Sequence, residues 1–310
     1  MDNRWIQICF DMIYEYLPKD IYKSKQRFVK IASHATAIAS EARIRLVDQA
    51  HISKVIGLFN EIGLCYDALG NYEQAIEHIM TSRIICEEYF GEEHIISSET
   101  YKIIGIISHH LGDPDIAWKW YKKALKIRIN NLGNDHIKMA EIYNNIALVF
   151  SDTRSQKYDL TLALEWFDKA LAIFKKNLGE EHREVSTIYR NMACIYNSMG
   201  DYAVAMRLHN EALKSRLREL GEEHAYVAQS YNDIGDVYKN QHNYDHSLDY
   251  YKKAMIIREK RFGVVHPRTI ESYRNVAYIY RVILETEKAE KYYNKAEEAY
   301  RLYKTQFFIT

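Results

Sequence analysis

Histidine is the residue type whose spacing first suggests chemistry in this chain, because imidazole serves as a metal ligand and as a general base. Five histidines end the similar strings FGEEH, LGNDH, LGEEH, LGEEH and FGVVH, at positions 94, 136, 182, 224 and 266. The ligands of one zinc ion must all lie within about 2 Å of the metal. Histidines spaced mostly 42 residues apart along a regular array cannot meet that condition. We therefore expect each one to hydrogen-bond the turn between two repeating units.

His109 and His110 form a second histidine group, near the end of a predicted helix. Neighbouring residues of a helix point about 100° apart, so the two rings cannot easily share one ion. We expect them to pack on the surface or in a groove. A ligand-binding or pH-sensing role is the alternative.

The common catalytic motifs are missing from the sequence. It contains no G-x-S-x-G, no G-x-x-x-x-G-K-[ST], no G-x-G-x-x-G and no H-E-x-x-H. The cysteines form no C-x-x-C pair, which favours free thiols in a reducing compartment and hence a cytoplasmic protein. They are Cys9, Cys65, Cys86 and Cys194. We predict a protein that is not an enzyme, with no catalytic residues, no cofactor and no metal.

Composition narrows the class further. The 310 residues include 42 Lys+Arg and 42 Asp+Glu, so the net charge is +0, which argues against a protein that coats nucleic acid or an anionic membrane. Only 3 Pro and 12 Gly are present, which favours long helices over turn-rich β architecture. Charges at Asp2, Arg4 and Asp11 interrupt any signal-peptide core, and no apolar run of about 18 residues predicts a membrane span. We expect neither nucleic-acid binding nor membrane insertion.

The intervals between the five histidines, 42, 46, 42 and 42 residues, define an internal repeat. Repeats of this length indicate stacked supersecondary units. Counting 42 residues back from His94 leads to Ile52, where the pattern also holds. The six predicted units are 52–93, 94–135, 136–181, 182–223, 224–265 and 266–310. The longer interval places four extra residues near Ser151–Lys157, which we expect to form a surface loop, or alternatively a lip over a groove or a partner contact.

Every unit repeats the same order of residue types. A small residue stands eleven positions after the unit start: Gly63, Gly105, Ala147, Ala193, Gly235 and Ala277. A turn follows, with residues suited to a helix N-cap: Asn71, Asp113, Asp159, Asp201 and Asn243. Beyond the turn, two small residues flank a bulky one: Ile79, Tyr121, Phe167, His209, Tyr251 or Tyr293. These spacings place the residues on one face of a helix, so each unit is predicted to be two helices joined by a tight turn.

A single helix pair cannot bury its apolar face, whereas stacked pairs bury a continuous core. We therefore predict an all-α solenoid of six helix pairs. Residues 1–51 do not follow the repeat, and their stretch Ile21–Val47 is predicted to be an amphipathic helix. We expect 1–51 to be an N-terminal helical cap; the tail of an upstream domain is the alternative.

The repeat resembles the tetratricopeptide repeat (TPR), in the 42-residue variety found in kinesin light chains. The resemblance covers about 52–300 and rests on LGEEH, YNNIALVF, YRNMACIYNSMGDYAVA and YKKALKIR, which begin at positions 178, 143, 189 and 121. It implies a right-handed superhelix whose concave groove is lined by the first helix of each pair. It also implies binding of a protein or peptide partner in that groove.

The resemblance assigns a peptide-holding role to one position on the first helices. Asparagine amides can donate to and accept from a peptide backbone, and by resemblance this role falls to Asn144, Asn145, Asn191, Asn232 and Asn275. Arg190 and Arg274 are expected to attract an acidic residue of the ligand, and Tyr278 to line a pocket. Asp233 and the pair Lys102–Ile103 depart from the pattern. The alternative is that the asparagines space the repeats instead.

These observations predict a protein–protein interaction scaffold that binds a peptide segment of a partner. A peptide-sensing or regulatory TPR module of a larger signalling protein is the alternative. The carboxylate clamp of chaperone-binding TPR proteins is disfavoured, because the second members of the required residue pairs are wrong: Leu64, Ile106, Leu148, Cys194, Asp236 and Tyr278. The sequence does not determine the oligomeric state.

Overall fold

The computed structural model describes residues 32–33, 37 and 49–308. The described residues form helices and turns and no strand. The predicted cap at 1–51 lies almost wholly outside them, and the boundaries of the six units remain a prediction.

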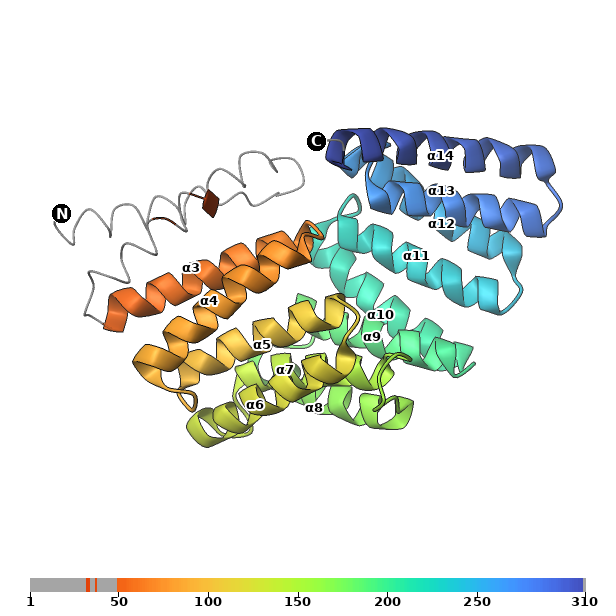
Figure 1. The fold of residues 1–310 in the computed structure, drawn as a ribbon. Helices are drawn as coiled ribbons and strands as arrows, with labels where there is room; N and C mark the ends of the chain where they lie inside the picture. Colours follow the sequence, from red (N-terminus) through yellow and green to blue (C-terminus); the bar gives the residue numbers. More distant parts are fainter. Residues whose placement is uncertain (1–31, 34–36, 38–48, 309–310) are drawn as a thin grey trace. The chain divides into compact units, whose positions relative to one another are not determined.

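Twelve helices are described, in six consecutive pairs (Figure 1). The pairs are α3 (Gln49–Ala68) with α4 (Tyr72–Phe90), α5 (Ile95–His110) with α6 (Pro114–Leu132), α7 (Ile137–Ser151) with α8 (Leu160–Leu178), α9 (Arg183–Ser198) with α10 (Tyr202–Leu220), α11 (Ala225–Asn240) with α12 (Tyr244–Phe262), and α13 (Pro267–Val282) with α14 (Thr286–Phe308). The predicted all-α fold of helix pairs is therefore confirmed.

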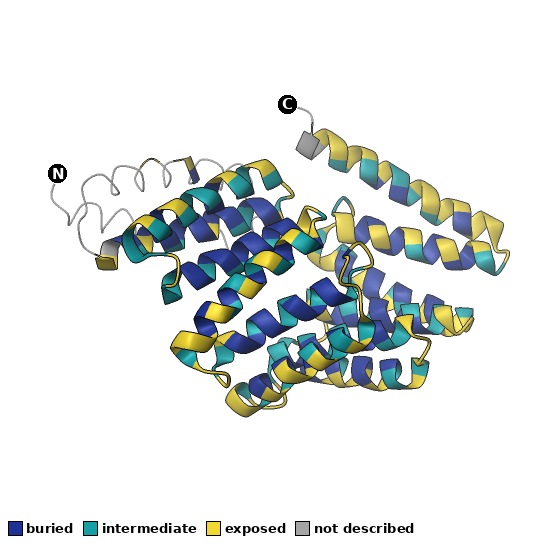
Figure 2. Ribbon diagram, turned by 60° about the horizontal axis from the view of Figure 1, so that its bottom comes forward, coloured by how far each residue is buried: buried dark blue, intermediate teal, exposed yellow. Residues whose placement is uncertain are grey.

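The chain divides into two compact units, one ending at Ile173 and the other beginning at Phe174. In the first unit, α4 contacts α5, α6 contacts α7, and the first helices α3, α5 and α7 contact one another in order. In the second unit, α10 contacts α11, α12 contacts α13, and α9 contacts α11. Buried residues lie on the helix sides that face these neighbours, and exposed residues lie on the outer sides (Figure 2). Polar side chains on successive first helices are thus close enough to interact.

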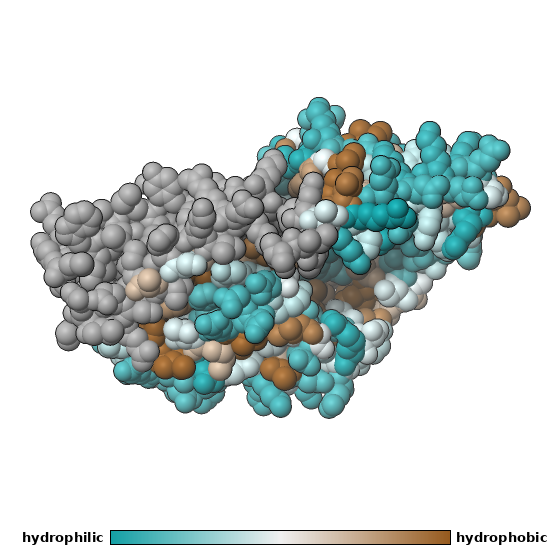
Figure 3. Space-filling model, turned by 45° about the horizontal axis from the view of Figure 1, so that its top comes forward, coloured by the Kyte–Doolittle hydropathy of each residue, from teal (hydrophilic) through white to brown (hydrophobic). Residues whose placement is uncertain are grey.

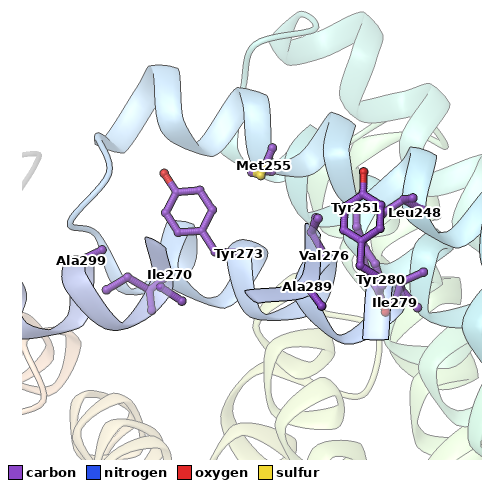
Figure 4. Packing of buried hydrophobic residues seen from close by; sticks show 11 residues of the cluster. Leu248, Tyr251, Met255, Ile270, Tyr273, Val276, Ile279, Tyr280, Ala289 and Ala299 are labelled. Atoms are coloured by element: carbon purple, nitrogen blue, oxygen red, sulfur yellow. The ribbon is translucent and has the colours of Figure 1, made fainter. Parts of the chain in front are cut away.

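Small residues allow the two helices of a pair to approach closely. A Cβ added to Gly105 would lie 2.4 Å from the Tyr121 ring, and one added to Gly235 would lie 2.8 Å from the Tyr251 ring. Both tyrosines are buried. The last two pairs share a core in which Tyr251, Tyr273 and Ile279 pack together with other apolar residues (Figure 4). The glycines are therefore required by packing rather than by turn geometry.

The five repeat histidines cap the first helices, as expected. In each, Nδ1 accepts a hydrogen bond from the backbone N–H two residues on, at 3.1–3.3 Å. The second helices are capped as predicted by Asn71, Asp159, Asp201 and Asn243. Asp113 occupies the same position but makes no side-chain cap bond; Pro114 follows it and sets the first turn through its fixed φ.

In two of the turns that join the helices of a pair, a residue other than glycine has a positive φ, in the left-handed region of backbone conformation. Gly70, Gly112 and Gly200 have φ between 73° and 97°, whereas His242 has φ 60° and Leu284 has φ 64°. A side chain with a Cβ costs about 1–2 kcal/mol in this conformation. Leu284 is also 86% exposed, so its side chain contributes little packing.

Leu284→Gly is therefore expected to raise the free energy of unfolding by about 0.5–1 kcal/mol, after allowance for the greater freedom of glycine in the unfolded chain. Urea unfolding followed by circular dichroism measures the change. The matched control is Gly200→Leu, which should lower stability by at least as much. Equal stability of Leu284→Gly and the wild type would contradict the assignment of strain to this turn.

Candidate functional site

Arg190 on α9 and Asp233 on α11 form the central ion pair of the second unit. Nε of Arg190 donates to one carboxylate oxygen of Asp233 at 2.6 Å, and Nη2 donates to the other at 3.3 Å. Burial disfavours the charged guanidinium, but the Asp233 carboxylate outweighs that effect and raises the pKa of Arg190. Asp233, which departs from the asparagine pattern of the sequence, is thus the partner of an arginine one repeat earlier.

Asn232 extends this polar row from α11 to α13. Its Nδ2 donates to Asp236 at 3.1 Å, and its Oδ1 accepts from Nδ2 of Asn275 at 2.9 Å. Asp236 also accepts from Nζ of Lys239 at 2.6 Å and from the hydroxyl of Tyr251 at 2.7 Å. The polar side chains of α9, α11 and α13 therefore form two hydrogen-bonded groups that meet at the neighbouring residues Asn232 and Asp233, and we call the two groups together the polar row.

The structure places the predicted asparagines in different surroundings. Asn191 accepts from Nη1 of Arg190 at 3.4 Å, next to the polar row, whereas Asn232 is buried and engaged on both sides. In the first unit, Nδ2 of Asn144 donates to Oδ1 of Asn145 at 3.3 Å. Of these asparagines, Asn232 and Asn275 bond each other between successive repeats, whereas these bonds of Asn144 and Asn191 are to the neighbouring residue of the same helix. Both the peptide-holding role and the spacing role remain predictions.

Arg274 and Tyr278 lie at a pocket of about 550 Å³ between α13 and α14, together with Arg281, Thr286, Glu290 and Tyr293. Arg274 reaches Glu297 of α14 at 3.3 Å, and its guanidinium carbon lies 5.2 Å from the ring centre of Tyr300. Tyr278 and Tyr293 are exposed. On the face seen in Figure 3, hydrophobic patches stand out among mostly hydrophilic side chains. This pocket joins an apolar floor to charged edges.

His109 and His110 bind different carboxylates. Nε2 of His109 lies 2.9 Å from Asp152, and Nδ1 of His110 lies 2.8 Å from Asp67. Burial lowers the pKa of His109, whereas the hydrogen bond to Asp67 raises the pKa of His110. Across the residues that the structure describes, no three His, Cys, Asp or Glu side chains gather to hold a metal ion. The two rings thus tie repeats together through separate partners.

A family comparison identifies the chain. The model of the tetratricopeptide repeat matches residues 55–130, 156–218 and 226–301. The chain is a tetratricopeptide repeat protein. No sequence among the curated proteins matches it. Within the described part of the chain, no helix combines the length and apolar character needed to cross a membrane.

Solved structures with the same fold include other TPR proteins. BtubC (BKLC) from P. vanneervenii is 23% identical, with a TM-score of 0.62 over 78% of this chain and 93% of that one. A Rap protein complexed with competence and sporulation factor is 15% identical, with a TM-score of 0.67 over 99% and 80%. NprR in complex with its cognate peptide NprX is 14% identical, with a TM-score of 0.63 over 99% and 84%.

Sequence reasoning missed the buried arginines that join successive TPR units. Arg128, Arg216 and Arg258 each donate to the backbone carbonyl ten residues ahead, in the first turn of the next helix. Nη1 of Arg216 and Nη1 of Arg258 also donate to serine hydroxyls, each at 2.9 Å. Arg216 and Arg258 are separated by one repeat length, which is the signal that could have revealed them.

The described cysteines of this TPR protein are free, and burial raises the pKa of each thiol. Burial raises the pKa of both Cys65 and Cys194 to about 11, so both thiols are protonated near neutral pH. A thiol in that form is a poor nucleophile. The buried histidine of the second unit is also uncharged near neutral pH, because burial lowers the pKa of His209 to about 4. It is 1% exposed and its Nδ1 has no hydrogen-bond partner.

Proposed function

We propose that this TPR protein is a non-enzymatic scaffold that binds a peptide segment of a partner protein along its first helices. The observation that carries the proposal is the polar row, with Asn191 and Asn275 beside Arg190 and Asn232. Amide groups held in a row offer donors and acceptors in register for an extended backbone. Bound peptide would exchange bonds within the row for bonds to its own backbone, so little hydrogen bonding would be lost.

The structural neighbours support a peptide as the ligand. The Rap protein and NprR were each solved with a bound factor or peptide, and both share the fold over nearly all of this chain. The same comparison supports the second candidate, a peptide-sensing or regulatory module of a larger signalling protein. The two differ in whether binding recruits a partner or changes an output elsewhere.

Further parts of the proposal follow from the residues. We infer that the protein acts without a cofactor, because its sequence lacks the common nucleotide-binding glycine motifs. We also infer that it does not bind nucleic acid, because its charges balance and the polar row mixes both signs. A cytoplasmic location is part of the same proposal, since the described cysteines are free.

The test captures partners from a lysate with the full chain. Wild type is compared with Asn145→Ala/Asn191→Ala/Asn275→Ala. The matched control is Asn130→Ala/Asn210→Ala/Asn294→Ala, which removes three exposed asparagines from second helices. Circular dichroism and the melting temperature establish that all three proteins are folded.

We expect a specific partner to bind wild type and the control but not the variant with Asn145→Ala/Asn191→Ala/Asn275→Ala, which we call the groove variant. A synthetic peptide from that partner should then bind with an affinity reduced at least tenfold by the groove variant. Equal capture by all three proteins would overturn the proposal and assign the asparagines to repeat spacing alone.

A further inference from the structure

The pocket between α13 and α14 corresponds to a groove that is filled in the preceding repeat. There, the groove between α11 and α12 is covered by α13, which contacts α12. Tyr251 of that groove is 1% exposed, whereas Tyr293, its counterpart 42 residues on, is 56% exposed. The α13–α14 pocket therefore has the form of a helix-docking groove, and no described helix occupies it.

The preceding repeats also indicate what charge a docked helix would carry. Arg190 on α9 forms an ion pair with Asp233, which lies on α11, the first helix of the next pair. Arg274 occupies the position of Arg190 two repeats later. Its nearest acid is Glu297 of its own pair, at 3.3 Å through a single nitrogen, and its guanidinium is exposed. A carboxylate from a docked helix would thus find a guanidinium already in place.

Glu290 distinguishes this groove from the filled ones. The corresponding residues of the two earlier repeats in this unit are Met206 and Leu248, both apolar. Because Glu290 is charged, the apolar floor of this pocket is formed by Ala277, Ala289 and the Tyr293 ring. A smaller apolar floor with charged edges favours a helix that binds reversibly over one that is permanently buried.

We propose that the α13–α14 groove binds an amphipathic helix of a partner protein, with a carboxylate of that helix paired to Arg274. The inference goes beyond the proposed function, because the extended peptide would lie along the asparagines of the first helices, whereas the helix would dock between α13 and α14. The docked helix takes the place that α11 holds against α9 and α10. Its apolar face covers Tyr293, and its acid meets Arg274 as Asp233 meets Arg190.

The chain itself supplies the probe. A fluorescent peptide with the sequence of residues 225–240, acetylated and amidated, is titrated with the full chain, and anisotropy reports binding. We expect saturable binding that weakens about tenfold when Asp233→Asn is made in the peptide. Arg274→Glu in the protein should abolish binding of the original peptide and restore it for a peptide with Asp233→Lys. The control Arg301→Glu, an exposed arginine of α14, should change nothing.

Three results would overturn the inference. They are no binding by the peptide, equal binding of the original peptide and its Asp233→Asn version, and a change of oligomeric state in Arg274→Glu by light scattering. The last would make a second copy of this chain the occupant. The lysate capture uses different variants and no α11 peptide. If the peptide does not bind in the titration but the lysate capture is positive, only the helix-docking inference fails and the proposed function stands. If the peptide binds but the capture fails, helix docking stands without the proposed function.

Discussion

Arg190→Ala is expected to lower the free energy of unfolding by about 3 kcal/mol, because it leaves the Asp233 carboxylate buried without its partner. The Asp233 side chain is only 9% exposed, so water cannot replace the guanidinium. Asp233→Ala should cost less, about 1–2 kcal/mol, since Arg190 retains more contact with solvent. The double variant should be more stable than the sum of the single effects predicts, by about 2 kcal/mol.

Urea unfolding of the four proteins at pH 7, followed by circular dichroism, completes this cycle. The matched control is Arg218→Ala, which breaks the exposed pair with Glu181 and should change stability by no more than about 0.5 kcal/mol. Additive effects of the two single changes would show that the pair is not coupled. Arg190 would then be available to a ligand, as the sequence alone suggested.

His209→Phe is expected to stabilise the protein, and to do so increasingly as the pH falls. Burial lowers the pKa of His209 to about 4, whereas an unfolded histidine titrates near about 6.5. The unfolded chain therefore binds the proton first, so stability is lost as the pH falls from about 6.5 towards 4. Phenylalanine carries no such proton, and Phe167, at the corresponding position of the preceding repeat, is fully buried.

The advantage of His209→Phe over wild type should grow by about 2–3 kcal/mol between pH 7 and pH 4.5. The charged groups around the ring include Arg190, Asp233 and Asp236 from neighbouring helices and Arg216 from its own. The chain has 13 histidines, so only the difference between the two proteins isolates this site. His246→Phe, an exposed histidine of α12, is the control and should run parallel to wild type. A constant difference across the pH range would show that His209 is not responsible.

The repeat and the helical spacing of small and bulky residues within each unit predicted the helix pairs, because residues at that spacing are buried together on one face of a helix. The repeat also predicted that His94 and its counterparts serve turns rather than metals. At Gly105 the sequence predicted only that a small residue is needed. That a Cβ there would clash with the Tyr121 ring follows from the position of that ring in the structure.

The partners of the polar residues could not be read from the same pattern. Arg190 meets Asp233, and Asn232 meets Asn275, at a separation of 43 residues in both cases. This is the repeat length plus one, and the extra residue reflects the offset between neighbouring first helices. Comparing residues 42 positions apart aligns equivalent positions and reveals the repeat. It does not reveal the contacts between side chains, which join residues 43 positions apart. Whether a residue faces a ligand or the next helix depends on that offset.

The arginines that reach the next first helix also determine how the protein responds to a pulling force. Arg216 and Arg258 each tie one helix pair to the pair that follows, through a carbonyl only ten residues ahead. These ties lie in series along the chain and carry the same tension, so we expect the weakest to open first and the others to follow one at a time. Extension then proceeds in steps of one helix pair, and each pair can close again on its neighbour when the tension falls.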